Sequence, residues 1–221
     1  MATSNNDRET ISELTTGRLS VYLRCLHYLE SIGQETVSSH ELAERFHLNS
    51  AQIRKDLACF GEFGTRGVGY NVAQLRSNLV FTLGLEQTRN AIIVGAGNLG
   101  MALADYRGFN SNGFCVVALL DIDRDKVGKT SRSGIPVLAY DQLGEVVSSN
   151  AVEIGIIAVT PDNAQQVYDA IVEAGVRAIL NFAPVQMRLR SGVKVKSVDL
   201  RINLESLSFY LKSAEEGTID T

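Results

Sequence analysis

Apolar side chains recur at helical spacing near the start of the chain and predict a first helix. They share one face, and Gly33 follows them as a residue that can end the helix. Residues 1–16 are polar, and we expect them to be disordered. The face is formed by Leu19, Tyr22, Leu23, Leu26 and Leu29.

A second and a third helix follow at the spacing of a helix-turn-helix motif. Ser38 and Glu41 have the capping-box spacing, which predicts that the second helix begins there. After a turn at residues 47–49, we expect Ser50 to cap a third helix that ends near Phe60. Two short helices separated by about three residues are typical of DNA-binding helix-turn-helix motifs.

Glycines and alternating apolar residues then predict a β-hairpin. The glycines permit turn conformations, and Val68, Tyr70 and Val72 alternate as in a strand. The hairpin would form a wing with Arg66 near its tip. Residues 1–85 are therefore predicted to be a winged helix-turn-helix domain.

From residue 91 the pattern changes to apolar strands that alternate with helices. A linking helix over 75–85 separates the two patterns, and the clearest later helix runs from Pro161 to about Glu173. This alternation predicts a small doubly wound α/β domain of the Rossmann type over 86–199. Its strands are predicted at 91–94, 114–120, 153–159, 178–182 and 193–198.

The last periodic segment, within residues 200–221, is too apolar to stand alone in water. Leucines recur along one stripe of a helix, and the tail from residue 214 is polar and expected to fray. We expect this helix to pack either on its own domain or on a partner. The stripe consists of Leu200, Leu204, Leu207 and Leu211.

Composition indicates a cytoplasmic protein. The chain has 221 residues, of which 45% are hydrophobic and 21% charged, and its start lacks the features of a signal peptide. The longest apolar runs are too short to cross a bilayer, so no membrane contact is expected. The three cysteines are widely spaced and the three histidines lack metal-ligand spacing, so we expect reduced thiols and no metal site.

The formal net charge of −4 argues weakly against a nucleic-acid partner, but the charge is unevenly distributed. Residues 45–76 contain five basic and only two acidic side chains. A local basic patch on an acidic protein can bind phosphate, because the electrostatic field near the patch, and not the net charge, determines whether a phosphate is attracted.

Candidate DNA-contacting residues lie on the third helix and on the wing. Ser50 and Gln52 are placed to read bases, and Arg54 and Lys55 can contact phosphates or guanine edges. From the wing, Arg66 could enter the minor groove. Tyr70, also on the wing, is a further candidate DNA-contacting residue. The alternative is a three-helix interaction module with a solvated basic face.

The segment Gly95-Ala96-Gly97-Asn98-Leu99-Gly100 lies between a predicted strand and a predicted helix, as a dinucleotide-binding turn does. Gly95 permits the tight turn, Gly97 lets the backbone approach a pyrophosphate, and Gly100 lets the helix pack against the strand. Free N–H groups at the helix start would hold the phosphates, with Asn98 as a polar contact. The alternative is a strand-to-helix turn without a ligand.

A carboxylate follows the next predicted strand. Asp121 lies about 20 residues beyond Gly100, where it can accept hydrogen bonds from the adenosine ribose and repel a 2′-phosphate. The sequence therefore predicts NAD(H) as the ligand. Later strand ends are placed to line the nicotinamide half, although their prolines could simply start helices or turns. The candidates there are Thr160, Pro161, Asn181 and Pro184.

The predicted cofactor site lacks acid–base machinery. The three histidines, His27, His40 and His47, all precede it, no Tyr-x-x-x-Lys sequence occurs, and the remaining chain is too short for a substrate domain. We therefore expect a sensor and not an enzyme. The alternatives are an NAD-dependent oxidoreductase fused to a DNA-binding domain, and a CoA-binding or ligase-like module.

Taken together, the two halves resemble the Rex family of redox-sensing transcriptional repressors, from about Leu19 to Lys212. The resemblance is carried by the glycine turn with Asp121 and by short segments along the chain. These segments are Gln52-Ile53-Arg54-Lys55-Asp56-Leu57, Phe60-Gly61, Gly64-Thr65-Arg66-Gly67-Val68-Gly69-Tyr70-Asn71-Val72, Lys126-Val127-Gly128 and Asn181-Phe182-Ala183-Pro184.

The resemblance implies a homodimer that binds a palindromic operator and represses genes of fermentation or respiration. It further implies that NADH releases the protein from DNA, that NAD⁺ permits binding, and that the C-terminal helix is swapped between protomers. Arg24, Tyr106 and Asp199 match a polar switch at the domain junction. Leu200 stands where some relatives carry an aromatic side chain beside the nicotinamide.

Overall fold

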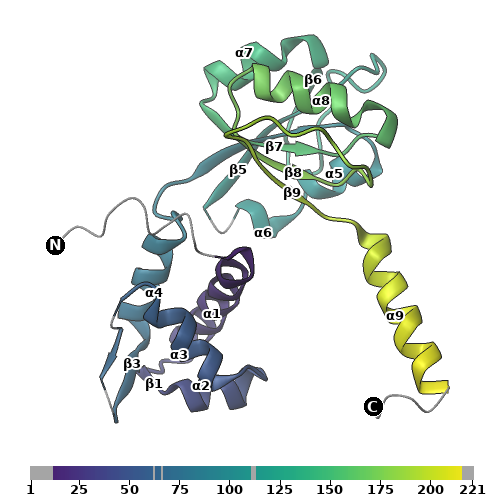
Figure 1. The fold of residues 1–221 in the computed structure, drawn as a ribbon. Helices are drawn as coiled ribbons and strands as arrows, with labels where there is room; N and C mark the ends of the chain where they lie inside the picture. The colour runs from purple at the N-terminus through teal and green to yellow at the C-terminus, as the bar shows by residue number, and fades with distance from the viewer. Residues whose placement is uncertain (1–11, 62, 66, 111–112, 216–221) are drawn as a thin grey trace. The chain divides into compact units, whose positions relative to one another are not determined.

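The computed structural model describes residues 12–61, 63–65, 67–110 and 113–215 (Figure 1). The chain divides into two compact units between Gln87 and Thr88. The elements of the first unit are α1 (Glu13–Ser31), β1 (Thr36–Val37), α2 (Ser39–Phe46), α3 (Ser50–Ala58), β2 (Gly64–Thr65), β3 (Gly69–Asn71) and α4 (Val72–Thr82).

The first two helices begin at side-chain caps. Ser12 caps α1, with its Oγ accepting from the Thr15 N–H at 3.2 Å. Since α1 begins at Glu13, the expectation of disorder through residue 16 is wrong for its last residues. The capping box of α2 is confirmed: the Ser38 Oγ accepts from the Glu41 N–H at 3.1 Å, and the Glu41 carboxylate accepts from the Ser38 N–H at 2.7 Å.

The N-cap residue of α3 is Asn49. The prediction of Ser50 as this cap is wrong. Asn49 has an extended backbone, and its Oδ1 accepts from the Gln52 N–H at 3.0 Å. Ser50 is the first helical residue. The helix ends at Ala58, two residues before the predicted Phe60.

A three-stranded antiparallel sheet in the order β1-β3-β2 forms the wing and its base. The two-residue strand β1 was not predicted, because so short a strand carries no periodicity. Val72 begins α4 and is not part of the wing strand, since the Asn71 side chain caps that helix. Gly69 has a φ of +94°, and a Cβ there would lie 2.6 Å from the Val37 carbonyl oxygen, so only glycine fits. The predicted wing-tip residue Arg66 lies outside the described residues.

The second unit is a Rossmann-type domain. Its elements are β4 (Arg89–Val94), α5 (Asn98–Ala104), α6 (Arg107–Asn110), β5 (Phe114–Asp121), β6 (Val137–Ala139), η2 (Tyr140–Gln142), α7 (Leu143–Ser149), β7 (Val152–Ile157), α8 (Pro161–Glu173), β8 (Ala178–Asn181), β9 (Lys194–Ser197) and α9 (Leu200–Glu215).

The six described strands form one parallel sheet in the order β6-β5-β4-β7-β8-β9. Alternate residues of β4 enter two separate cores, because successive side chains of a strand point to opposite faces. Ile92 and Val94 pack with the helices α7 and α8, whereas Ala91 and Ile93 pack with α5. The strand order reverses between β4 and β7, and ligands of such sheets bind outside the carboxyl ends of the strands at this point.

The helix α9 is exposed from Leu200 to Lys212, and Ser213 near its end is buried. The leucine stripe at Leu204, Leu207 and Leu211 is 59–68% exposed, so the second unit does not bury it. The helix includes residues 214 and 215, which the sequence had suggested would fray, and residues 216–221 lie outside the described part. An uncovered apolar helix on a globular domain marks an interaction surface.

Candidate cofactor and DNA-binding sites

The glycine turn joins β4 to α5 at the point where the strand order reverses. Gly95 has a φ of +106°, and a Cβ there would lie 2.5 Å from the Ala158 carbonyl oxygen. A Cβ on Gly100 would lie 1.8 Å from the Gly95 carbonyl oxygen. These two glycines are therefore required by the fold of the turn itself.

Gly97 differs from its two neighbours in the turn. It is exposed, its φ is −79°, and a Cβ there would meet no atom of the described residues within 4 Å. It is the N-cap residue of α5 and, as a glycine, provides no side-chain cap. Asn98 and Leu99 are exposed on the first turn, while Ala96 is buried. The fold leaves this position open, and such an opening fits a ligand phosphate.

Asp121 ends β5 and holds the glycine turn in place. Its Oδ2 accepts from the Ala96 N–H at 2.7 Å and from Lys126 Nζ at 3.1 Å, and its Oδ1 accepts from the Asp123 N–H at 2.9 Å. The residue is only 8% exposed. Among the described residues Oδ1 accepts from Asp123 alone, so this oxygen can accept one further hydrogen bond.

Lys126 is a site residue that the sequence reasoning did not assign. Burial would raise the pKa of the Asp121 carboxyl, but hydrogen bonds from the backbones of Asp123 and Ala96 and from Lys126 outweigh burial and lower that pKa. The hydrogen bond to Asp121 raises the pKa of Lys126 in turn. The sequence signal that could have identified Lys126 is a lysine five residues after the acid that ends the strand. Asp121 is therefore ionised and paired at neutral pH.

A cavity of about 200 Å³ lies beside the turn. It brings together Gly95 and Asp121, as predicted for one ligand, and adds apolar walls that suit a flat ring. The hydroxyl of Tyr140, which also lines the cavity, is buried and has no hydrogen-bond partner among the described residues. The other lining residues are Val94, Leu120, Ile122, Val159, Asn163, Gln166 and Val167.

The later strand ends take different roles. Thr160 is the N-cap residue of α8 and its Oγ1 accepts from Asn163 Nδ2 at 3.0 Å, with Pro161 at the first helical position. The Asn181 side chain is fully buried, where it bonds both the N–H and the carbonyl of Ala183 at 2.9 Å. Asn181 thus supports the turn that follows β8, and its place beside the nicotinamide stays a prediction.

Pro184 lies away from the cavity at the glycine turn. It is exposed and lines a second cavity of about 280 Å³, together with Asp199 and Ile202. Asp199 accepts from the Arg201 N–H at 2.9 Å at the start of α9, where Leu200 is 63% exposed. The structure therefore groups Pro184 with the start of the C-terminal helix.

The other two predicted switch residues are exposed. Tyr106 is 57% exposed and packs edge-on against Phe109, with ring centroids 5.1 Å apart. Arg24 is exposed on α1, in the first unit, whereas Tyr106 and Asp199 belong to the second.

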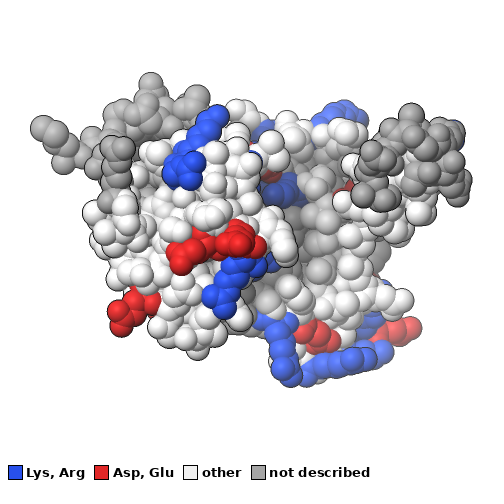
Figure 2. All heavy atoms as spheres, turned by 90° about the horizontal axis from the view of Figure 1, so that it is seen from below, with Lys and Arg blue, Asp and Glu red and all other residues white. Residues whose placement is uncertain are grey.

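A groove of about 830 Å³ separates α3 from the wing. Arg54 lines it and donates from Nη1 to the Ser39 Oγ at 3.0 Å, at the start of α2. Tyr70 lines its other side, and burial raises the pKa of the Tyr70 hydroxyl. Lys55 is exposed on α3, and Ser50 is half-buried at its first turn. On the face drawn in Figure 2, Lys and Arg side chains stand in separate groups, some beside Asp or Glu.

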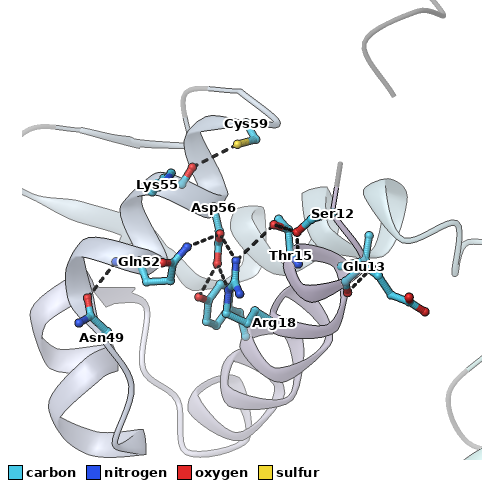
Figure 3. A network of polar contacts seen from close by, with 11 residues as sticks. Ser12, Glu13, Thr15, Arg18, Asn49, Gln52, Lys55, Asp56 and Cys59 are labelled. Atoms are coloured by element: carbon cyan, nitrogen blue, oxygen red, sulfur yellow. Dashed lines mark hydrogen bonds and ion pairs between the residues drawn. The ribbon is translucent and has the colours of Figure 1, made fainter. Parts of the chain in front are cut away.

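Gln52, a predicted base-reading residue, has a hydrogen-bond partner within α3. Its Nε2 donates to Asp56 Oδ1 at 2.7 Å, one turn along the helix (Figure 3). Asp56 is 2% exposed and also accepts from Arg18 and Tyr22 of α1. The sequence pattern did not suggest the contact of Gln52 with Asp56, and the reading of a base by Gln52 stays a prediction.

The described residues contain no group of three or more His, Cys, Asp or Glu side chains that could hold a metal ion, and Cys25, Cys59 and Cys115 are free thiols. None of the described helices is long and apolar enough to span a membrane.

A winged helix-turn-helix unit joined to a Rossmann-type unit with an open glycine turn defines a DNA-binding regulator with a nucleotide-sensing domain. Family models match both units: the CoA binding domain over residues 86–185, and the putative DNA-binding protein N-terminus over residues 10–58. The first match corresponds to the alternative of a CoA-binding module. The relatives that match over most of the chain are instead named transcriptional repressors.

The redox-sensing transcriptional repressor Rex of Carboxydothermus hydrogenoformans is 52% identical over 202 residues, covering 91% of this chain and 97% of that protein. The Rex repressor of Streptomyces coelicolor is 47% identical over 212 residues, covering 95% and 82%. The chain belongs to the Rex family of redox-sensing transcriptional repressors, which confirms the resemblance seen in its sequence.

Solved structures agree with this assignment. The crystal structure of RSP in complex with β-NAD⁺ and operator DNA has a TM-score of 0.87 and 38% identity, and covers 93% of this chain and 94% of that one. RSP in complex with β-NADH has a TM-score of 0.82 and 36% identity, covering 93% and 96%. The predicted fold class, a winged helix-turn-helix unit before a Rossmann-type unit, is confirmed.

Proposed function

We propose that this chain is a cytoplasmic repressor that binds operator DNA through α3 and the wing and is released from it by NADH. The observation that carries the proposal is the open position at Gly97, beside the paired carboxylate Asp121, in a chain that also carries a winged helix. NAD(H) supplies the redox signal. In our proposal, the exposed N–H groups at the start of α5 hold its pyrophosphate, and Asp121 Oδ1 accepts one ribose hydroxyl.

The signal reaches DNA as a population shift. Reduced and oxidised nicotinamide differ by one charge and in ring planarity, so each must favour a different placement of the two units. A ligand that bound both placements equally would shift nothing. In this proposal Arg24, Tyr106 and Asp199 are the groups that respond.

The proposed assembly is a homodimer in which α9 inserts into the partner. The exposed leucine stripe of α9 supports it, because each buried leucine would contribute about 1.5–3 kcal/mol. A twofold protein matches a palindromic operator, whose half-sites repeat with the helical turn of DNA.

The test is operator binding titrated separately with NADH and NAD⁺. We expect NADH to release operator DNA and NAD⁺ to compete with NADH without causing release. Equal effects of the two forms would contradict redox sensing. Steady turnover of NADH with a small carbonyl compound would favour the oxidoreductase alternative, and a preference for CoA over NADH would favour the CoA-binding module.

Replacing Arg54 by alanine should weaken operator binding by roughly 5- to 150-fold, the range for one lost base or phosphate contact of about 1–3 kcal/mol. The Arg54 guanidinium lies in the groove between α3 and the wing. Fluorescence anisotropy at moderate salt measures the loss. Arg45→Ala is the matched control, since Arg45 is held on Tyr28 and Gln34. If both variants bound the operator as tightly as the parent chain, Arg54 would not be a DNA-contacting residue.

Replacing Asp121 by asparagine should weaken NADH binding and narrow the preference for NADH over NADPH. The substitution removes the charge that repels a 2′-phosphate and leaves Lys126 with Asp123 as its remaining acidic partner. Isothermal titration with each nucleotide measures both effects. Glu153→Gln, which alters an exposed acid paired with Arg89, is the control. An unchanged ratio of the two affinities would contradict the ribose assignment.

A further inference from the structure

A buried carboxylate in α3 is hydrogen-bonded on every side (Figure 3). Asp56 Oδ2 accepts from Arg18 Nε and from the Tyr22 hydroxyl at 2.8 Å, and Oδ1 accepts from Arg18 Nη2 at 2.8 Å and from Gln52 Nε2 at 2.7 Å. A carboxylate has about four acceptor positions, so all of them are used. Arg18 also donates to the Thr15 hydroxyl at 3.2 Å.

The carboxylate determines which side of α3 faces α1. Arg18 and Tyr22 come from α1, while Gln52 and Asp56 lie one turn apart on α3. Arg54 is two residues from each of them, which is about 200° around the helix. Holding Asp56 inward against α1 therefore turns Arg54 outward into the groove.

We propose that Arg18, Tyr22 and Gln52 form a positioning site around Asp56 that fixes the rotation of the recognition helix, and that Gln52 acts through Asp56 and not on a base. The inference rests on the proposed operator contacts of α3. The Asp56 cluster, as we name these four residues, would let α3 present Arg54 and Lys55 in one orientation.

Apolar packing alone would hold α3 less specifically. Ile53 and Leu57 are buried in the core of the first unit, but apolar contacts are non-directional, so they specify the rotation of a helix less sharply than hydrogen bonds do. A planar guanidinium paired side-on with a carboxylate fixes both distance and angle. The Asp56 carboxylate is buried, whereas the Arg18 side chain is 35% exposed. Such an ion pair contributes little net stability, so a positional role accounts for it better than a stabilising one.

The charges of the Asp56 cluster are constant at neutral pH. The hydrogen bond from Arg18 is the main cause that lowers the pKa of the Asp56 carboxyl. Burial, followed by the hydrogen bond to Asp56, raises the pKa of the Tyr22 hydroxyl above its ordinary value. Tyr22 therefore remains a donor and Asp56 an acceptor. Because the pKa of Asp56 is lowered on folding, its contribution is complete above the ordinary carboxyl pKa and is lost only in acid.

The test compares Arg18→Lys, which keeps the charge but loses the planar fork, with Leu79→Ala. Leu79 is fully buried in α4 of the same core, so Leu79→Ala destabilises the unit without touching the Asp56 cluster. We expect Arg18→Lys to lower operator affinity about tenfold at equal folded fraction, the size of one lost base contact, with affinity for non-specific DNA and for NADH unchanged. Tyr22→Phe should act in the same direction.

A binding series over single base-pair changes in the operator tests the role of Gln52. For Gln52→Ala we expect a uniform loss over all positions. Relaxed discrimination at one base pair only would show that Gln52 reads a base and would overturn its positioning role. An equal ratio of operator to non-specific affinity in Arg18→Lys and Leu79→Ala would overturn the positioning site as a whole. If these two ratios were equal while Arg54→Ala still weakened operator binding, the positioning site would be wrong and the proposed function would remain supported.

Discussion

Replacing Gly97 by alanine is expected to leave the fold intact and to abolish most NADH binding. Gly97 has an ordinary φ, is exposed, and would place its Cβ in open space, so the change should alter stability by no more than about 0.5 kcal/mol. The methyl group would instead stand between the start of α5 and the pyrophosphate. Losing one charged hydrogen bond costs about 1.5–3 kcal/mol, so we expect a loss of at least roughly tenfold.

In the Gly97→Ala variant, thermal unfolding should be unchanged, and operator release should require correspondingly more NADH than for the parent chain. Gly144→Ala is the control, since a Cβ at Gly144 on α7 also meets no atom within 4 Å. Gly100→Ala should instead disrupt the turn, because its Cβ would overlap the Gly95 carbonyl oxygen. Parent-like NADH affinity in Gly97→Ala would show that no phosphate approaches this glycine.

Replacing Leu204 and Leu207 together by glutamate is expected to dissociate the dimer and with it operator binding. Both side chains are more than half exposed on α9 and would be buried only against a partner. Burial of each contributes about 1.5–3 kcal/mol, and a buried unpaired carboxylate adds a further penalty. Sedimentation should therefore show a monomer at concentrations where the parent is a dimer.

The control for this variant lies on the same helix. Arg201 and Glu205 form an exposed i,i+4 ion pair, so replacing both by alanine should change neither assembly nor operator affinity. NADH binding by the second unit should survive in the glutamate variant if each protomer holds its own cofactor. A stable dimer that still responds to NADH would show that α9 is not the dimer contact.

The predictions from the sequence were most accurate where the local backbone conformation requires a particular residue type. The capping box at Ser38 and Glu41 and the helix from Pro161 to Glu173 appear as predicted, because caps and N-terminal prolines act within a few residues. The predictions were less accurate where neighbouring residues had equal local propensity. Asn49 and Ser50 are both good caps, and only the chain path into α3 decides between them.

What the sequence determined by itself was the order of elements, the glycine turn with its strand-end acid, and the family, since periodicity and short motifs are local properties of the chain. The tertiary structure decided how the polar side chains are used. Asp121 is tied to Ala96 and Lys126, Asn181 is buried in its own turn, and Gln52 faces Asp56. Hydrogen-bond partners of buried polar groups are set by the packing of distant elements, and this depends on three-dimensional proximity.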